Sequence, residues 1–345
     1  MIYKFIIRPL LFLLEPETAH HLIFAIVSRL TFLYPFFKLF YSPNDKNQDV
    51  ELGGLTFRNR FGIAAGLDKD ATALRFFFTI GFSHIEVGTV TPKPQDGNPK
   101  PRLFRLVKES ALINRMGFNN AGMDTVKNNI QLARKYIKNN FIIGVNIGKN
   151  KDTPLEKAYE DYNTCLEKLY DEADYFTVNI SSPNTEGLRA LQTDEYLEKL
   201  LSEINKKNIE VALSKKIKPK NIFLKIAPDL TDKEIEHILI LAVKYDLSGI
   251  VATNTTLSRD RLSEDTEETG GLSGKPLKDR SNQVLKKFND LNSDTPFGKL
   301  ILIGVGGVFN KNDYKEQLID GADLIQVYTG YIYEGNSILK KILND

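Results

Sequence analysis

Short apolar runs alternate with longer amphipathic segments from residue 61 to the end of the chain. The short runs have the length and composition of buried β-strands, and the longer segments repeat their apolar residues at helical spacing. The expected strands cover residues 61–66, 84–91, 141–148, 175–182, 221–228, 249–256, 299–307 and 324–330. The longer segments include residues 119–139, 155–173, 231–245 and 278–290. Eight parallel strands, each followed by a helix, predict an α/β fold, namely a closed (β/α)8 TIM barrel.

Nearly every expected strand becomes polar or rich in glycine at its carboxyl end, where TIM barrels place their active sites. The residues expected to meet there are Asn146, Asn179, Ser182, Lys225, Asn254, Thr255 and Gly306. The stretch VNISSPNT, residues 178–185, is by itself also typical of a tight turn. A doubly wound open sheet is the alternative architecture, but the chain lacks the glycine-rich dinucleotide fingerprint of that fold.

Residues 1–41 follow a different pattern and hold ten of the 35 Phe and Tyr residues of the chain. Pro16 and Glu17 suit the first turn of a helix, and apolar residues then recur at helical spacing, so we expect two short amphipathic helices. Arg8, Pro9 and the letters EPET argue against a signal peptide, and polar residues interrupt any membrane-spanning run. The apolar stripe either packs on the main domain or lies in a membrane surface, and the pattern alone favours neither.

Composition fits one large domain with a small appendage, because 42% of the 345 residues are hydrophobic and 26% are charged. The net charge is +2 and the lysines are scattered over predicted helix faces, which argues against a nucleic-acid partner. Cys165 is the single cysteine and lies in a helical setting, where we expect a core thiol. No internal disulfide or cysteine zinc site is possible, which favours a reducing compartment.

Histidine and metal chemistry are both disfavoured at the barrel mouth. The four histidines are His20, His21, His84 and His237. None of them is expected at the mouth, so histidine is largely excluded as a catalytic base there. No cluster of His, Cys and carboxylate residues gathers at the strand ends, so we expect no metal site.

Asparagine amides are the groups that gather at the mouth instead. They belong to Asn114, Asn146, Asn179, Asn184 and Asn254. Each amide offers a donor beside an acceptor, which matches the CO–NH edges of a flavin or a pyrimidine. The glycine-rich stretches at residues 304–307 and 328–330 lie where TIM barrels bind phosphate.

Lys225, at the end of the fifth expected strand, completes a site for a mononucleotide flavin. Its ammonium group could stabilise the edge of the ring that becomes anionic on reduction. The alternative is a lysine in a salt bridge, which we rank second because the stretch LKIAP faces a mostly apolar barrel interior.

Long motifs in a shared order make the chain resemble the dihydroorotate dehydrogenases, and specifically their quinone-dependent, membrane-associated class (class 2). The motifs are PETAHH, GIAAGLDKD, EVGTVTPKPQDGNPKPRLFRL, INRMGFNNAG, GVNIGKNK, TVNISSPNT, LKIAPD, TNTT, GGLSGKPL, GVGGV and QVYTG. The resemblance covers essentially the whole chain. It implies oxidation of (S)-dihydroorotate to orotate in pyrimidine (UMP) biosynthesis, with FMN as the bound cofactor and a membrane quinone as the electron acceptor.

The resemblance also implies roles for individual residues. Those similar to FMN contacts are Ala65, Gly66, Lys69, Thr89, Asn146, Asn179, Lys225, Thr253, Gly274, Gly306, Tyr328 and Thr329. Those similar to the orotate pocket are Lys69, Asn114, Arg115, Met116, Gly117, Phe118, Asn179, Asn184, Asn254 and Thr255. Ser182 resembles the catalytic base, and the soluble relatives have cysteine at that loop position. His20, Arg105 and Tyr328 match the positions that bind the quinone head.

For the first 41 residues, the resemblance shifts the expectation toward membrane docking. It divides the chain into residues 1–41, an amphipathic segment for the membrane and the quinone tunnel, and residues 42–345, the FMN-binding catalytic barrel. The insertion at residues 92–115 is expected to form part of the tunnel and a lid over the substrate. The implied location is peripheral, on the cytoplasmic face of a bacterial inner membrane, with no obligate protein partner inferred.

One residue departs from the family pattern, and two rival interpretations remain. Ala71 stands where many members have glycine, which leaves the backbone of that loop to be established. A soluble flavin dehydrogenase using fumarate or NAD would lack the amphipathic segment and would use cysteine as its base. A catalytically inactive membrane scaffold would not need Lys69, Asn114, Ser182 and Lys225, all of which are present.

Overall fold

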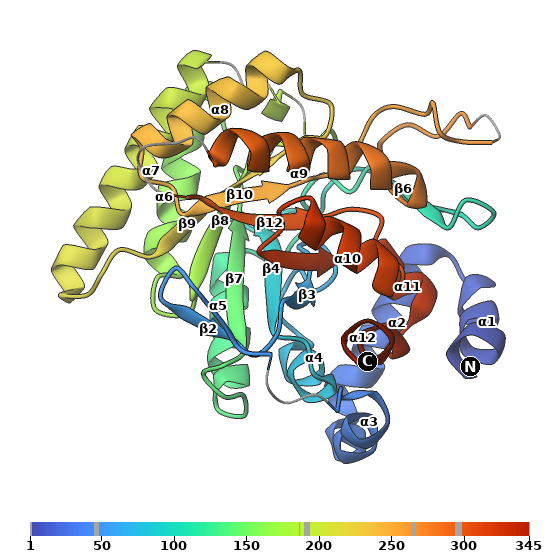
Figure 1. The fold of residues 1–345 in the computed structure, drawn as a ribbon. Helices are drawn as coiled ribbons and strands as arrows, with labels where there is room; N and C mark the ends of the chain where they lie inside the picture. The colour runs from blue at the N-terminus through green and yellow to red at the C-terminus, as the bar shows by residue number, and fades with distance from the viewer. Residues whose placement is uncertain are drawn as a thin grey trace.

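A barrel of eight parallel strands forms the centre of the computed structural model, which describes residues 2–44, 48–185, 187–189, 194–263, 266–293 and 299–344. The strands are β3 (Phe61–Ile63), β4 (His84–Val90), β7 (Ile142–Ile147), β8 (Tyr175–Asn179), β9 (Asn221–Ile226), β10 (Gly249–Ala252), β12 (Ile301–Val305) and β13 (Leu324–Val327). Strand β13 pairs with β3, so the sheet closes on itself. The predicted TIM barrel is confirmed (Figure 1).

Each barrel strand is followed by a helix, as the alternating pattern predicts. The helices are α4 (Leu74–Ile80), α5 (Met123–Arg134), α6 (Ala158–Lys168), α7 (Asp194–Lys215), α8 (Asp232–Lys244), α9 (Lys278–Asn292), α10 (Lys311–Ile319), α11 (Thr329–Glu334) and α12 (Ser337–Leu343). Helix α8 shows how local sequence sets a boundary. The Thr231 hydroxyl caps the Glu234 N–H while the Glu234 carboxylate accepts from the Thr231 N–H, a capping box that satisfies two backbone donors.

The strands are shorter than the predicted runs at their carboxyl ends. Strand β8 ends at Asn179 and strand β10 at Ala252, so the polar residues that follow belong to loops. Ser182 after β8, and Asn254 and Thr255 after β10, line the cavity at the barrel mouth. The polar residues at the ends of the predicted runs therefore predict the location of the site better than they predict where the strands end.

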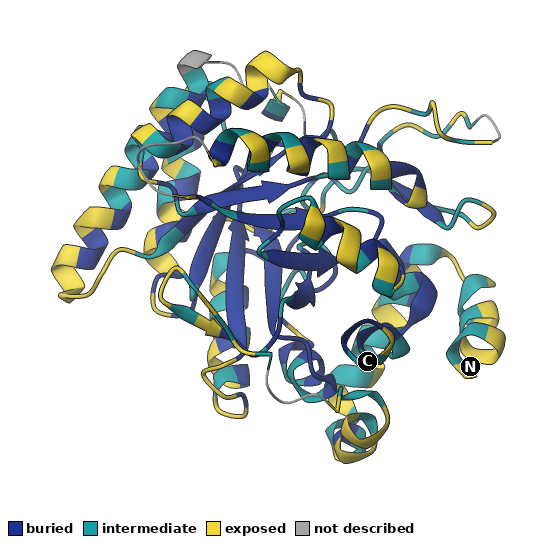
Figure 2. Ribbon diagram, in the orientation of Figure 1, coloured by how far each residue is buried: buried dark blue, intermediate teal, exposed yellow. Residues whose placement is uncertain are grey.

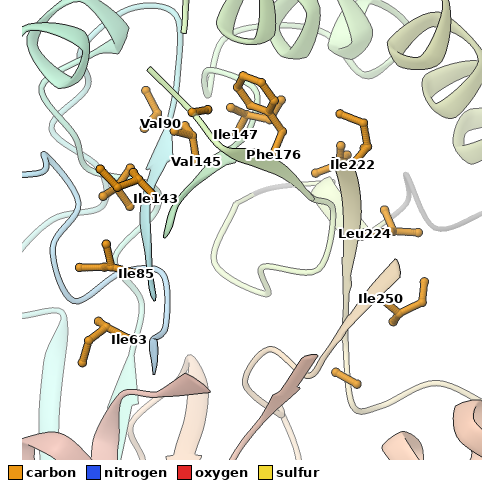
Figure 3. Close-up of a cluster of buried hydrophobic side chains, with 14 of the residues drawn as sticks. Ile63, Ile85, Val90, Ile143, Val145, Ile147, Phe176, Ile222, Leu224 and Ile250 are labelled. Atoms are coloured by element: carbon orange, nitrogen blue, oxygen red, sulfur yellow. The ribbon is translucent and has the colours of Figure 1, made fainter. Parts of the chain in front are cut away.

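Two apolar layers hold the barrel together. Alternate strand residues, including Ile85, Ile143 and Leu224, point outward and pack under the helices (Figure 3). The opposite faces of the strands fill the interior with a smaller cluster around Tyr175 and Phe223. Figure 2 shows the barrel strands largely buried and the helices exposed on their outer faces. Cys165 lies in the outer layer and is buried, as predicted for a core thiol.

A small antiparallel sheet beside the mouth was not predicted from the sequence. Its order is β11 (Gly271–Gly274), β6 (Ala111–Asn114) and β5 (Leu103–Leu106). Strands β5 and β6 come from the insertion at residues 92–115, and β11 comes from the loop that follows β10. The sheet therefore ties two long loops together at the carboxyl ends of the barrel strands.

The N-terminal cap, which we define as residues 2–41, contains more helices than the two predicted. A π-helical turn (η1, Tyr3–Ile7) runs into α1 (Arg8–Phe12), and α2 (Pro16–Arg29) follows. A 3₁₀ turn (η2, Thr31–Leu33) then leads to α3 (Tyr34–Tyr41). The prediction failed because non-helical backbone at Glu15 and Leu30 divides one apolar pattern, and prolines at or next to the first position begin α2 and α3.

One face of the cap packs on the barrel helices. The Phe24 ring lies 6.3 Å from that of Phe77, and the Phe37 ring lies 5.3 Å from that of Phe76, both on α4. Docking on the main domain, one of the two alternatives, is thus confirmed for this face. In the described part of the chain no single helix is long and apolar enough to cross a membrane. One bent pair, Pro16–Arg29 with Thr31–Tyr41 at 74°, meets the criterion by length and composition.

Candidate active site

A cavity of about 1010 Å³, part of it open to solvent, lies at the carboxyl ends of the barrel strands. The predicted FMN contacts that line it are Ala65, Gly66, Lys69, Thr89, Asn179, Lys225, Thr253, Gly274, Gly306, Tyr328 and Thr329. The predicted orotate contacts that line it are Lys69, Asn114, Met116, Gly117, Phe118, Asn179, Asn184, Asn254 and Thr255. Ser182 lines it as well. Residues from six of the eight strand–helix connections, together with Lys225 near the end of β9, thus meet in one space.

Two predicted contacts do not line this cavity. Asn146 lies behind its wall, fully buried, and acts through Thr89 and Asn179. The Arg115 side chain turns away, because its guanidinium binds Glu268 at 2.7 Å and lies over the Phe104 ring at 4.4 Å. Sequence alone could not reveal these partners of Arg115, since Glu268 lies far along the chain.

The loop after β8 holds Ser182 against the cavity. The Ser182 hydroxyl accepts a hydrogen bond from the Asn184 backbone N–H at 3.3 Å, so the stretch is a turn as well as a cavity wall. The Asn184 Nδ2 donates to the Asn114 Oδ1 at 3.1 Å, and the Asn184 backbone carbonyl accepts from the Asn98 Nδ2 at 3.0 Å. Asn98 belongs to the insertion, which therefore fixes the serine loop from outside.

A chain of amides runs along the cavity wall. The Thr89 hydroxyl and the Asn179 Nδ2 both donate to the Asn146 Oδ1, at 2.6 and 3.1 Å. The Asn179 Oδ1 in turn accepts from the Ser181 hydroxyl at 3.2 Å and from the Asn254 Nδ2 at 3.4 Å. Each amide is thus oriented by its neighbour.

Glu86 lies beneath this chain, and the sequence interpretation missed it. The carboxylate is fully buried and accepts from the Asn146 Nδ2 at 2.7 Å, the Thr177 hydroxyl at 3.0 Å and the Gln326 Nε2 at 3.2 Å. The Lys225 ammonium lies 3.9 Å from its Oε1. A signal was present in the sequence, because a glutamate within the apolar strand HIEVGTV must be paired when the strand is buried.

Two lysines, the buried Lys225 and the half-buried Lys69, give the cavity its charge. Burial lowers the pKa of Lys225, and Glu86 opposes that shift. Burial, with the charge of Arg102, lowers the pKa of Lys69 to about 7, and the Lys69 ammonium donates to the Asn119 Oδ1. An anion beside either ammonium would favour its charged form. Lys225 therefore both pairs with Glu86, as the salt-bridge alternative predicted, and lies on the cavity wall.

Glycines form the wall on the side of β12 and β13. Gly306 and Gly307 have φ of +146° and +69°, and a Cβ on Gly307 would lie 2.3 Å from the Cβ of Lys278. With no side chains, these residues leave backbone groups accessible beside Thr329 and Gly330, which suits a phosphate.

The residues present fit a flavin mononucleotide. The Gln326 side chain borders the cavity, and its Oε1 is buried without a hydrogen-bond partner among the described residues, so a donor on a flat ring can satisfy it. Amides and Lys225 suit the polar edge of such a ring, and the glycine wall suits its phosphate. In the described ranges no three His, Cys, Asp or Glu side chains come together as metal ligands.

A second cavity of about 640 Å³ lies between α2 and the barrel. Gly66, Lys69, Met116 and Tyr328 line both cavities, so the two share a wall. His20 lines the second cavity, where its ring stacks on Phe24 at 4.3 Å, and burial lowers its pKa to about 4.

Arg105, the third residue predicted for the quinone, lines neither cavity. Its guanidinium donates to the Leu14 carbonyl oxygen at 2.7 Å and lies 4.5 Å from the Phe12 ring. It therefore holds the turn between α1 and α2. Only His20 and Tyr328 of the predicted set border the second cavity.

A buried ion pair joins the cap to the insertion, and this pair was also missed. Arg102 donates from Nη2 and Nε to the Glu17 carboxylate at 2.6 and 3.1 Å. Burial would raise the pKa of Glu17, but the hydrogen bonds and charges of Arg102 and Lys100 lower it to about 2. The Arg102 Nη1 also donates to the Asn98 carbonyl at 2.9 Å. Contacts thus run from α2 through Arg102 and Asn98 to the loop of Ser182.

Comparisons with known proteins agree on one family. The family model described as dihydroorotate dehydrogenase matches residues 48–345. A curated protein of Aliivibrio fischeri, dihydroorotate dehydrogenase (quinone), is 46% identical over 347 residues and covers all of both chains. Its namesake in Vibrio parahaemolyticus is 47% identical over the same span and coverage. A crystal structure of DHODH from Eimeria tenella with ferulenol has a TM-score of 0.83 at 36% identity, covering 95% of this chain and 89% of that one.

Proposed function

Because the chain belongs to the dihydroorotate dehydrogenase family, in its quinone-dependent class, we propose that the cavity at the strand ends holds FMN beside dihydroorotate. The enzyme oxidises dihydroorotate to orotate, a step of pyrimidine biosynthesis, and a quinone accepts the electrons. The observation that carries the site is the meeting of Ser182, Lys225 and the asparagine amides with a glycine wall in one cavity.

For FMN, we propose that backbone groups of Gly306, Gly307, Thr329 and Gly330 bind the phosphate, and that Asn179 and Lys225 face the ring. When bound, FMN would supply the two-electron chemistry that links oxidation of dihydroorotate to reduction of the quinone. The charged form of Lys225 would stabilise negative charge on a bound ring, and Glu86 at 3.9 Å favours that charged form by raising the pKa of Lys225.

Ser182 is proposed as the base that removes a proton from a substrate carbon. An alcohol is a weak base, so Ser182 must pass its own proton to water or a neighbouring group as it takes the proton from carbon. Its position supports this role, because the hydroxyl borders the cavity and the loop is held by Asn184, Asn114 and Asn98.

Lys69 and the amides of Asn114, Asn184 and Asn254 are proposed to bind the substrate. Dihydroorotate carries a carboxylate and CO–NH edges, which suit an ammonium and a set of amides. Because burial and Arg102 lower the pKa of Lys69 to about 7, an anionic substrate would raise the fraction of charged Lys69 at neutral pH.

The quinone is proposed to enter through the second cavity, past His20 and Tyr328. Tyr328 lines both cavities, which supports a position for this residue between the proposed flavin and quinone sites. Arg105 takes a supporting role in this proposal, since it holds the turn between α1 and α2.

The cap is proposed to dock on the cytoplasmic face of the inner membrane. Its outer face exposes large apolar side chains, and Lys38 lies beside them on α3. An exposed apolar face with nearby cations is typical of helices that lie in a membrane surface, from which a membrane quinone could reach the second cavity.

One anaerobic titration tests the proposed function. The protein is purified in mild detergent, and dihydroorotate is added while the flavin absorbance is followed. We expect bleaching, which a short-chain quinone reverses and which fumarate or NAD does not. Reversal by fumarate or NAD would favour the soluble type of dehydrogenase. Flavin that dihydroorotate cannot bleach at full occupancy would contradict the proposal.

A further inference from the structure

Glu86 lies beneath the candidate site, where oxidation of the substrate itself requires no carboxylate. Its side chain is fully buried in β4, yet it does not line the cavity. Its carboxylate accepts four hydrogen bonds, from Asn146, Thr177, Tyr175 and Gln326, and the Lys225 ammonium lies 3.9 Å from its Oε1. A buried carboxyl group with this many partners needs a reason beyond packing.

The reason lies in hydrogen-bond direction. A carboxylate accepts hydrogen bonds only, so Asn146 must turn its Nδ2 toward Glu86 and its Oδ1 toward Thr89 and Asn179. Asn179 must then present its Nδ2 to Asn146 and its Oδ1 to Asn254. If the Asn146 amide rotated by 180°, its NH₂ group would face the NH₂ group of Asn179. The Asn179 amide would then have to rotate as well to regain a hydrogen bond.

We propose that Glu86 is a positioning residue that sets the orientation of the amides of Asn146, Asn179 and Asn254 and so decides which of their edges meet the ligands. This inference rests on the proposed function, because the ligands are the proposed FMN and orotate. A glutamine at position 86 offers both a donor and an acceptor, so it would permit both orientations of the chain.

The test measures the dissociation constant of orotate in the FMN-loaded enzyme by the change in flavin absorbance. Glu86→Gln keeps the side-chain shape, and we expect it to weaken orotate binding roughly tenfold, the effect of one misdirected hydrogen bond. The double variant Glu86→Gln/Asn146→Asp moves the acceptor-only group to position 146, where it again faces Thr89 and Asn179. We expect it to restore affinity to within about threefold of the wild type.

Thr177→Val is the matched control. It removes another buried hydrogen bond to the same carboxylate but leaves Asn146 oriented, so orotate affinity should stay within about twofold of the wild type. FMN content and the unfolding midpoint, measured for each variant, report structural damage. A merely structural role of Glu86 predicts that the double variant is no better than Glu86→Gln.

The binding measurements distinguish failure of the proposed role of Glu86 from failure of the proposed function. Wild-type affinity in Glu86→Gln, an equal loss in Thr177→Val, or no recovery in the double variant would overturn the role of Glu86. If Glu86→Gln fails to retain FMN, recovery of FMN and orotate binding in the double variant supports the role, and failure to recover overturns it. Wild-type enzyme that neither binds orotate nor is bleached by dihydroorotate would instead overturn the proposed function.

Discussion

At the barrel mouth, polar side chains orient one another, whereas on the outer face of the N-terminal cap large apolar side chains are left in solvent. Asn179 bonds to Asn146 and Asn254 within the wall of the cavity. On α3, by contrast, Phe36 and Phe40 are 62 and 63% exposed. Changing a single hydrogen-bonding atom can disrupt the network at the barrel mouth. The affinity of the apolar cap face for a membrane should instead fall in proportion to the apolar area removed. The two regions should therefore respond to different substitutions.

The largest expected effect is at the mouth. Ser182→Ala should keep FMN bound but slow flavin bleaching by dihydroorotate roughly 10²–10⁴-fold at neutral pH, because a positioned base contributes about that much. Stopped-flow absorbance measures the rate. Reoxidation of chemically reduced enzyme by a short-chain quinone is the control and should stay unchanged, since Ser182 acts only on dihydroorotate. Bleaching at the wild-type rate would remove Ser182 from its role.

The ion pair between the two regions should give the next largest effect. Glu17→Gln leaves Arg102 buried without its carboxylate, which should reduce the free energy of unfolding at pH 7 by about 3 kcal/mol. The pKa of Glu17 is lowered from 4.5 to about 2, so its stabilisation is present above pH 4.5 and is lost as the pH falls toward 2.

Denaturant unfolding of the wild type and Glu17→Gln at several pH values checks whether the stabilisation by Glu17 decreases as the pH falls. The difference between the two proteins should be constant near neutral pH and should narrow below pH 4.5. A difference that stays constant down to acid pH would mean that the Glu17 charge does not stabilise the docked cap.

The exposed face of the cap predicts a graded effect. Phe36→Ser/Phe40→Ser should weaken binding to vesicles of phosphatidylethanolamine and phosphatidylglycerol roughly tenfold or more, because each ring loses apolar area that lipid would bury. Vesicle flotation measures the binding. Flavin bleaching by dihydroorotate should not change. Deleting residues 1–41 is a poorer test, because it also removes Glu17 from Arg102.

Leu213→Ser/Ile240→Ser is the matched control for that pair. These residues lie on α7 and α8 and are 72 and 63% exposed, but they are outside the cap. Their substitution should leave vesicle binding intact. If both double variants bind vesicles equally well, the cap face is not a membrane surface.

The parts predicted from sequence are those that local patterns determine. All eight barrel strands were predicted because each is a short apolar run between longer segments. The meeting of the strand-end residues in one cavity could be predicted because a TIM barrel has the carboxyl ends of all its strands on one side.

The parts that sequence did not reveal depend on partners far along the chain. Arg115 meets Glu268, and Arg102 meets Glu17, through loops whose course no periodic pattern describes. The sheet of β5, β6 and β11 likewise joins two distant loops. Arg105 was assigned to the quinone by resemblance, but a backbone carbonyl of the cap holds it, and carbonyls leave no signal in a sequence.

The smallest expected effect concerns the one departure from the family pattern. Ala71 is buried with φ of +60°, in the left-handed region that favours glycine. It belongs to the loop in which the Asp68 carboxylate accepts from the Thr72 and Ala73 backbone N–H groups, next to Lys69 on the cavity wall. The hydrogen bonds of Asp68 therefore hold the alanine in an unfavourable conformation.

Ala71→Gly should raise the free energy of unfolding by up to about 1 kcal/mol, because relief of the left-handed alanine outweighs the greater freedom of glycine in the unfolded chain. Ala73→Gly, in the same loop at φ of −120°, is the matched control and should lower stability. Denaturant unfolding of the FMN-loaded variants compares them. If the two substitutions change the free energy of unfolding in opposite directions, the hydrogen bonds of Asp68 hold Ala71 in a left-handed conformation that alanine disfavours. Equal losses would mean that packing of the alanine methyl group, rather than backbone strain, decides the stability of this loop.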